Sequence, residues 1–337
     1  MKFTALTALV ALLPAIALAE QAGHGHDNGG HHGGGPSDPT YPQPFRKNDL
    51  KALVTFGDSY TDTTWITNGG TIQWPQMVAN YADISLYPYA KSGGTCSNNI
   101  TYRPFPPVFG SQIPTFLADE KNHTIRLNER ETLYSLWIGT NDVGVSSLLT
   151  GDNKASILDV AGCMVDWVTT MYGYGARNFL FQNMVPLELT PLYSAHSWPN
   201  RYWNLERNTT EWSVTMRELV LSGNALTKLM LQGLASKLHD AHIGLFDSHT
   251  LFNDMYTNPA AWLNGTAPAF NVTGCVDSCI YQIDSTESVC TMVNGTDRDS
   301  YLWYDELHPS EQADRHVARE IANIFEGTGS KFVTWLS

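Results

Sequence analysis

The sequence predicts an α/β fold in which one mainly parallel sheet is covered by helices on both faces. Short apolar runs of strand length alternate with longer stretches in which apolar residues recur at helical spacing. This alternation is typical of parallel sheets, because consecutive parallel strands are joined by a helical crossover. The chain has 337 residues, of which 42% are hydrophobic, so a sizeable core is expected. With one core and no internal repeat, we expect a single folded domain.

The apolar patterns place the elements of this domain. We expect strands at 52–56, 84–89, 133–138, 178–182 and 243–246, and helices at 111–118, 155–172, 203–239 and 310–325. In the last helix Val317, Ile321 and Ile324 fall at helical spacing, and Gly327 stands where a helix stops. Residues 253–300 hold three glycosylation sequons and three cysteines and predict a long, irregular insertion.

The N-terminus predicts an exported protein. Lys2 is followed by an apolar run at 3–16 and by the small residues Ala17 and Ala19, the pattern of a signal peptide at 1–19. The run is too short to span a bilayer. Residues 20–45 are rich in His, Gly and Pro, which predicts a flexible tail; such tracts can bind divalent metal, but we interpret this one as a solvated leader to the folded domain at 46–337.

Six Asn-x-Ser/Thr sequons indicate N-glycosylation of an exported chain. They mark surface loops and stand at Asn99, Asn122, Asn208, Asn264, Asn271 and Asn294.

The five cysteines fit an oxidising compartment and predict at least one disulfide. Cys275, Cys279 and Cys290 cluster in a turn-rich segment, where a local disulfide is expected. The odd count leaves one thiol unpaired, and we assign this to Cys163 because it lies in an apolar helical pattern. Zinc fits the cluster poorly, since no histidine stands at ligand spacing.

The net charge of −13 argues against nucleic acid and anionic membranes as partners, because both would repel the chain. We expect a neutral substrate, a monomer, and no metal or other cofactor.

A candidate nucleophile follows the first strand. Ser59 stands in Phe56-Gly57-Asp58-Ser59-Tyr60, at the carboxyl end of strand 52–56, where open parallel sheets form their active sites. Taken alone, Gly-Asp-Ser is equally good turn chemistry.

Two further blocks follow the second and third strands. Gly93, or Gly94 in its place, can bring a backbone N–H close to a ligand, and Asn141 can present its side-chain amide. Together with the N–H of Ser59 they would form an oxyanion hole with three donors. Each block on its own is also compatible with an ordinary turn.

The fourth block, Asp305-Glu306-Leu307-His308, directly precedes the last helix. Its spacing lets the Asp305 carboxylate reach Nδ1 of His308, which leaves Nε2 free to accept the Ser59 proton. The simpler alternative is that the block only marks the start of a helix with Asp305 as its cap, a role for which Ser310 is equally suitable.

Taken together and in this order, the four blocks resemble the GDSL, or SGNH, hydrolase superfamily over roughly residues 50 to 325. The resemblance implies a flavodoxin-like three-layer α/β/α sandwich with Ser59 as nucleophile, His308 as base and Asp305 as its orienting acid. It also implies Ser59, Gly93 and Asn141 as oxyanion donors. The chain departs from the name-giving pattern at Tyr60, where leucine is usual.

The sequence of residues 55–62 is similar to that of secreted fungal acetyl esterases of carbohydrate esterase family sixteen. This resemblance implies acetylated xylan oligosaccharides as substrates. Trp65, in a polar stretch after the nucleophile, is the expected sugar contact. The polar segment 61–70 favours a small acyl group over the long chain that a lipase or phospholipase of the same superfamily would bind. The sequence is also compatible with an inactive glycan-binding protein, or with a metal-dependent deacetylase that would use His239 and His242.

Overall fold

The computed structural model describes residues 40–65, 72–266 and 270–337, and one compact unit spans Pro39–Ser337. The predicted signal peptide and residues 20–39 of the predicted tail lie outside the described residues. The prediction of a flexible tail is wrong for 40–45, where the Tyr41 N–H donates to the carbonyl of Thr328 at 2.7 Å and Phe45 is buried.

A six-stranded sheet forms the centre of the fold, in the order β10-β5-β4-β3-β1-β2. All neighbours are parallel except β10, which pairs antiparallel with β5. The five predicted strands are confirmed, whereas β10 was not predicted, because it is a three-residue, partly exposed edge strand with little apolar pattern. The strands are β1 Ala52–Gly57, β2 Ser85–Pro88, β3 Thr132–Trp137, β4 Asn178–Gln182, β5 His242–Phe246 and β10 Val333–Trp335.

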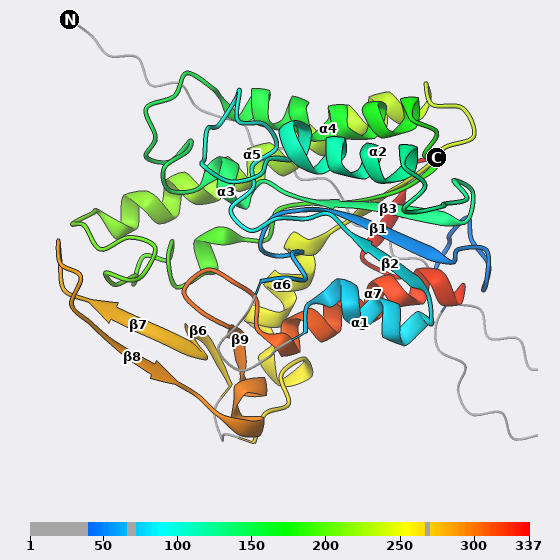
Figure 1. Cartoon of the computed structure of the whole chain (residues 1–337). Helices are drawn as coiled ribbons and strands as arrows, with labels where there is room; N and C mark the ends of the chain where they lie inside the picture. Colours follow the sequence, from blue (N-terminus) through cyan, green and yellow to red (C-terminus); the bar gives the residue numbers. More distant parts are fainter. Residues whose placement is uncertain (1–39, 66–71, 267–269) are drawn as a thin grey trace, which may run out of the picture. The chain divides into compact units, whose positions relative to one another are not determined.

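Helices cover both faces of this sheet, so the predicted three-layer α/β/α sandwich is confirmed (Figure 1). One face carries α2 Ile113–Lys121, α4 Ile157–Gly173 and α5 Thr209–Ala235. The other carries α1 Trp74–Ala82, α6 Ser248–Thr257 and α7 Glu311–Glu326. The central strands β1, β3 and β4 are buried along their whole length, which explains why their sequences are continuous apolar runs.

The helix boundaries differ from the prediction where caps decide them. Helix α5 begins at Thr209 rather than at 203, because the side chain of Asn208 accepts a hydrogen bond from the backbone N–H of Glu211 and caps the helix there. The short helices α1 and α6 were not predicted. Helix α7 is confirmed: Ser310 caps its start, and Gly327 ends it with φ of 82°.

The segment predicted as an irregular insertion is more regular than expected. It holds β6 Asn271–Cys275, β7 Asp277–Tyr281 and β8 Ser288–Met292, and β9 Tyr301–Trp303 follows it. Strand β6 pairs parallel with β9, and β7 pairs antiparallel with β8 as a hairpin. These strands were missed because they are short and their pattern is largely polar.

The remaining elements are the four-residue helix α3 Thr140–Val143, the π-helical turn η1 Val108–Gln112 and the 3₁₀ turns η2 Leu187–Leu189, η3 Pro259–Ala261 and η4 Gly295–Ser300.

The cysteine assignment was partly wrong. Cys279 and Cys290 form the expected local disulfide across the β7–β8 hairpin. Cys163, however, is bonded to Cys96, and the free, buried thiol is Cys275. A helical apolar pattern shows that Cys163 faces inward, but it does not show which loop packs against it.

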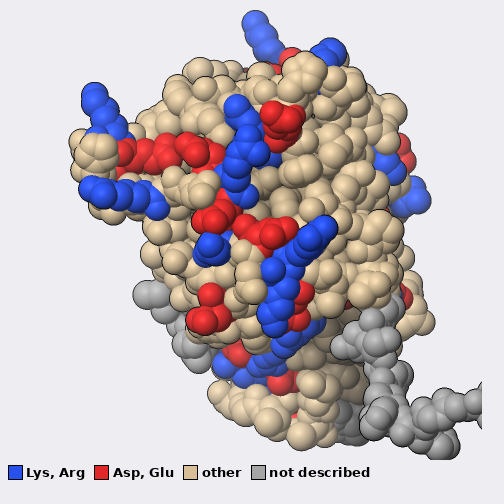
Figure 2. Space-filling view, turned by 90° about the vertical axis from the view of Figure 1, so that its right-hand side faces the viewer, with Lys and Arg blue, Asp and Glu red and all other residues tan. Residues whose placement is uncertain are grey.

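The charges are intermixed on the face shown in Figure 2, where Lys and Arg side chains lie among Asp and Glu. Lys51, at the entry to β1, forms an ion pair with Glu131 at 2.9 Å. In the described ranges, no helix is both long and apolar enough to cross a membrane.

Candidate active site

Three neighbouring strands bring the first three sequence blocks to one edge of the sheet. Strand β1 lies between β2 and β3, and all three run parallel. Ser59 follows β1, Gly93 follows β2, and Asn141 follows β3. Because the carboxyl ends of parallel strands meet at the same edge, these loops are adjacent in space.

The turn that carries Ser59 is held tightly at Gly57. Its φ is 152°, and a Cβ atom there would collide with the carbonyl oxygen of Trp137, so only glycine fits. The buried side chain of Gln112 binds both backbone groups of this residue: its Oε1 accepts the N–H of Gly57 at 3.0 Å, and its Nε2 donates to the Gly57 carbonyl at 2.7 Å. Sequence reasoning missed Gln112, since a single glutamine in a helical pattern gives no signal.

Ser59 lies in hydrogen-bond contact with His308, although 249 residues separate them. Ser59 Oγ is 2.7 Å from His308 Nε2. On the other side of the ring, His308 Nδ1 is 2.9 Å and 3.0 Å from the two oxygens of Asp305. All three residues are buried, with 6%, 4% and 2% of Ser59, His308 and Asp305 exposed. The structure therefore brings the three predicted residues together in the order that serine hydrolysis requires.

Asp305 is held as a carboxylate. Burial by itself would raise its pKa, but the charge of His308 and hydrogen bonds from His308 and Tyr202 outweigh burial and hold the pKa of Asp305 below its ordinary value. The ionised Asp305 can only accept, so in the neutral ring the proton of His308 is on Nδ1 and Nε2 is the acceptor facing Ser59.

Tyr60, the departure from the usual leucine, joins the nucleophile turn to the histidine loop. Its hydroxyl donates to the carbonyl oxygen of Leu307 at 2.6 Å, and its ring packs edge-on against Trp137 at 5.4 Å. A leucine could not make this hydrogen bond. Tyr60 therefore fixes the distance between the loops of Ser59 and His308.

Of the two candidate glycines, Gly93 fits the predicted donor role better than Gly94. The N–H of Gly94 already donates to the carbonyl of Lys91 at 3.0 Å, whereas within the described residues no hydrogen bond uses the N–H of Gly93. Gly93 has φ of 75°, and a Cβ atom there would lie 2.5 Å from the ring of Phe105. The side-chain amide of Asn141 donates to the carbonyl of Gly94 at 2.9 Å, which fixes its orientation, and among the described residues its second N–H has no partner.

Asp142, next to Asn141, holds the loop that follows the glycine block. Its carboxyl group accepts the N–H of Cys96 at 3.1 Å and the hydroxyl of Thr101 at 2.6 Å. The disulfide from Cys96 to Cys163 then ties the loop to helix α4. The oxyanion side of the site therefore rests on a loop that is fixed from two directions.

Trp65 forms a wall of the site. Its ring centroid lies 4.2 Å from that of His308, tilted by 33°, and 5.7 Å from that of Tyr304, to which it is edge-on. Residues 66–70 of the predicted polar segment lie outside the described residues.

His239 and His242 are not part of this site. They flank the entry to β5 and therefore lie at the amino end of that strand, the opposite end from the Ser59 turn. In the described part of the chain, no group of three or more metal-ligating side chains is clustered.

Tyr202 is the other residue that sequence reasoning missed. Its hydroxyl lies 2.6 Å from Asp305 Oδ2 and 3.0 Å from His308 Nδ1. It belongs to none of the four sequence blocks, and no spacing in the sequence connects it to them.

A serine directly after the first strand of a three-layer sandwich, with an Asp-x-x-His motif before the last helix, characterises one class of serine hydrolase. The sequence pattern of the GDSL-like Lipase/Acylhydrolase family matches residues 53–321. The chain belongs to this family, as the four blocks predicted.

Two curated relatives match nearly the whole chain. An acetylesterase of Hypocrea jecorina is 31% identical over 88% of this chain and 93% of its own. An acetylesterase of Thermothelomyces thermophilus is 23% identical over 85% of this chain and 92% of its own. The protein is accordingly a carboxylic ester hydrolase, and the hypothesis of an inactive glycan-binding protein has no support.

A solved structure, that of an acetylxylan esterase from Geobacillus stearothermophilus, aligns with 86% of this chain and 98% of its own. The identity is 12% and the TM-score 0.44, a similarity that does not bear on the substrate.

Proposed function

We propose that this chain is a secreted serine esterase that removes acetyl groups from plant cell-wall oligosaccharides such as acetylated xylo-oligosaccharides. The observation that carries the catalytic part is the 2.7 Å contact between Ser59 and His308, with Asp305 behind the ring. The preference for acetyl is supported by the two acetylesterases that match this chain along nearly its full length.

Ser59 is the proposed nucleophile. His308 Nε2 takes the proton of the Ser59 hydroxyl as Oγ forms a bond to the acetyl carbonyl carbon. His308 then gives this proton to the sugar oxygen as the ester bond breaks, which leaves an acetyl group on Ser59. A water molecule repeats the sequence: His308 accepts its proton as the water oxygen bonds to the acetyl carbon, and then returns this proton to Ser59 Oγ as the bond from Oγ to the acetyl group breaks and acetic acid leaves.

The developing negative charge falls on the carbonyl oxygen. The N–H groups of Ser59 and Gly93 and the free N–H of Asn141 are the proposed donors to it. All three come from loops fixed before the substrate arrives, so little reorganisation is required at the moment of reaction.

The test is a rate series on p-nitrophenyl esters of increasing acyl length. We expect a maximum at acetyl and the loss of turnover in Ser59→Ala, while Ser236→Ala, an exposed serine at the end of α5, remains active. A maximum at eight carbons or more would overturn the acetyl preference, and an active Ser59→Ala would overturn the assignment of the nucleophile.

A lipase would need an apolar groove beside Ser59. A hollow of about 1020 Å³ with partly apolar walls does exist, between the loop at 97–102 and helix α4. Neither Ser59 nor His308 lines it. Its position therefore does not favour a long acyl chain at the nucleophile.

The carbohydrate part of the proposal rests on Trp65, because a flat ring suits the apolar face of a sugar. Deacetylation of acetylated xylo-oligosaccharides, with the released positions mapped by NMR, would identify the sugar and the ester position. Absence of turnover on these oligosaccharides, with p-nitrophenyl acetate still cleaved, would exclude this substrate class.

Secretion and glycosylation are supported by two disulfides and by the position of the sequons. All six sequon asparagines are in described residues, five of them exposed and Asn271 partly buried. N-terminal sequencing of the product from culture medium should show cleavage near Ala19, and enzymatic deglycosylation should lower its mass. We further propose that the protein acts as a monomer on neutral carbohydrate, without nucleic acid or membrane partners.

A further inference from the structure

Tyr202 completes the surroundings of the Asp305 carboxylate. Oδ1 of Asp305 accepts the backbone N–H groups of Leu307 and His308, each at 2.8 Å. Oδ2 has no backbone donor within the described residues and is reached by the Tyr202 hydroxyl at 2.6 Å. His308 Nδ1 lies between the two oxygens. Without Tyr202, one buried carboxylate oxygen would depend on the imidazole alone.

The direction of this hydrogen bond is fixed by charge. Burial and the neighbouring charge of Asp305 raise the pKa of Tyr202 well above its ordinary value, so the hydroxyl keeps its proton. An ionised Asp305 can only accept. The Tyr202 hydroxyl therefore donates to Oδ2, and a hydrogen bond to a charged acceptor in a buried site is among the stronger ones.

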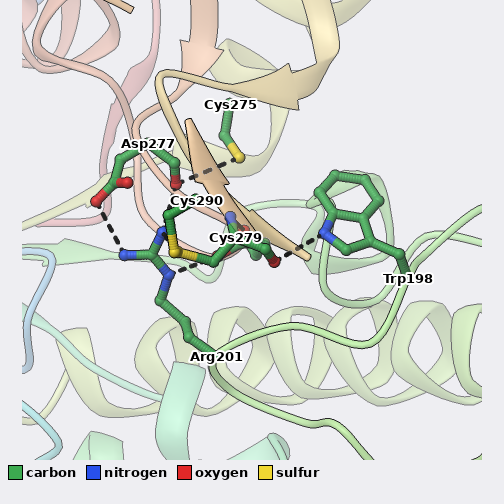
Figure 3. The surroundings of a disulfide bond; sticks show 7 residues. Trp198, Arg201, Cys275, Asp277, Cys279 and Cys290 are labelled. Atoms are coloured by element: carbon green, nitrogen blue, oxygen red, sulfur yellow. Dashed lines mark hydrogen bonds and ion pairs between the residues drawn. A yellow bond between two sulfur atoms is a disulfide. The ribbon is translucent and has the colours of Figure 1, made fainter. Parts of the chain in front are cut away.

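Arg201 anchors the backbone next to Tyr202 (Figure 3). One guanidinium nitrogen lies 2.9 Å from Asp277 Oδ2, another donates to the Asp277 carbonyl at 2.7 Å, and Nε is 2.8 Å from Glu306 Oε2. Asp277 belongs to hairpin β7–β8, and Glu306 follows Asp305 directly. Arg201 thus ties the segment of Tyr202 to the loop that it contacts.

The hairpin is fixed to the same loop. The backbone N–H of Cys279 donates to the other oxygen of Glu306 at 2.6 Å, and the disulfide from Cys279 to Cys290 joins the two hairpin strands. The segment that carries Tyr202, hairpin β7–β8 and the loop of Glu306 are therefore bound to one another, and these contacts hold the Tyr202 hydroxyl in place.

We propose that Tyr202 is a positioning residue for ester hydrolysis, which donates its hydroxyl proton to Asp305 Oδ2 in a hydrogen bond and thereby fixes the carboxylate against His308. This inference rests on the proposed function of Ser59, His308 and Asp305. Tyr202 takes part in no bond-making step. It acts through Asp305, whose orientation sets the tautomer and the ring angle of His308.

The test is Tyr202→Phe, which keeps the ring and removes only the hydroxyl. We expect kcat on p-nitrophenyl acetate to fall about 10- to 100-fold, the loss typical of one hydrogen bond to a charged group, with KM changed less than about twofold. The matched control is Tyr172→Phe, which loses a 3.0 Å hydroxyl contact to the carbonyl of His239, away from the site. The control should keep wild-type kcat.

A second readout separates positioning from general stability. The proton on His308 Nδ1 should give a low-field NMR signal that shifts or broadens in Tyr202→Phe and is unchanged in Tyr172→Phe. This measurement also works in a Ser59→Ala background, so it does not depend on turnover.

The outcomes distinguish the two proposals. If Ser59→Ala is inactive while Tyr202→Phe keeps wild-type kcat and an unchanged Nδ1 signal, the positioning role is wrong and the proposed function stands. If Ser59→Ala remains active, the proposed function fails first and the role of Tyr202 fails with it. A loss in Tyr202→Phe that is found in KM rather than in kcat would also contradict the inference.

Discussion

The buried carboxyl groups have different surroundings in the two halves of the site. In the strand-end half, formed by the loops after β1, β2 and β3, Asp58 and Asp142 are held by neutral donors, and burial raises their pKa to about 7 and about 6. In the histidine half, formed by residues 198–207, hairpin β7–β8 and the loop at 304–310, Asp305 faces His308 and Glu306 faces Arg201.

The difference follows from the charge that each half has to support. A negative charge beside the oxyanion donors would oppose the charge that develops on the substrate, so a raised pKa at Asp58 and Asp142 lowers that opposition. Behind His308 a negative charge is needed, because it stabilises the imidazolium formed during the reaction. The contrast holds for Asp58, Asp142 and Asp305. It does not extend to Asp62, where burial would raise the pKa but hydrogen bonds from Thr64 and Ser92 hold it below its ordinary value, or to Glu306, whose pKa is raised by burial.

Removing the disulfides tests which half depends more on its covalent link. The bond from Cys96 to Cys163 closes 67 residues and that from Cys279 to Cys290 closes 11. Chain entropy predicts that Cys96→Ser with Cys163→Ser lowers the free energy of unfolding by about 4 kcal/mol, and the hairpin pair replaced in the same way by about 3 kcal/mol. Urea unfolding of both double variants gives the comparison. Equal losses, or a larger loss for the hairpin pair, would contradict it.

Asn141→Ala tests the strand-end half in catalysis. Loss of one oxyanion donor should lower kcat about 10²- to 10³-fold, because the interaction forms fully only in the transition state. KM for p-nitrophenyl acetate should change little. Asn253→Ala, on the exposed side of α6, is the control and should retain wild-type rates. A variant of Asn141 with near-normal kcat would remove this residue from the oxyanion hole.

Asp58→Asn tests the pH dependence that the comparison implies. The folded state keeps the Asp58 proton up to about pH 7, whereas the unfolded chain releases it near its ordinary pKa of 3.8. The stability from this group is therefore present at low pH and lost as pH rises through 7. Between pH 5 and pH 7 the wild type should lose about 2 kcal/mol more than Asp58→Asn.

Thermal unfolding at both pH values measures this difference. Asp152→Asn, an exposed carboxylate, serves as the control and should follow the wild type. Parallel curves for the wild type and Asp58→Asn would show that Asp58 is ionised in the folded state across this range.

Trp65→Ala gives the smallest expected effect and tests the wall over His308. Loss of one ring contact with a sugar should lower kcat/KM on acetylated xylo-oligosaccharides about 2- to 10-fold, with less change on p-nitrophenyl acetate. Trp335→Ala, on the edge strand β10, removes a similar partly buried ring away from the site. Unchanged kcat/KM on the oligosaccharides would exclude Trp65 as a sugar contact.

Local patterns along the chain were enough to predict the five parallel strands and the residues placed at the carboxyl edge of their sheet. Buried strands and long amphipathic helices leave periodic patterns, and Ser59, Gly93 and Asn141 each come shortly after such a strand. Asp305 and His308 could be found because they stand only three positions apart, a spacing whose geometry is local.

Partners from distant parts of the chain became visible only in the folded molecule. The bond of Cys163 to Cys96, the contacts of Gln112 with Gly57, and the hydroxyl of Tyr202 at Asp305 join positions 67, 55 and 103 residues apart. No periodicity records such pairs, because each depends on how complete elements pack rather than on neighbouring residues. The reacting groups could be predicted from the sequence, whereas the contacts that hold them in place are set by tertiary packing.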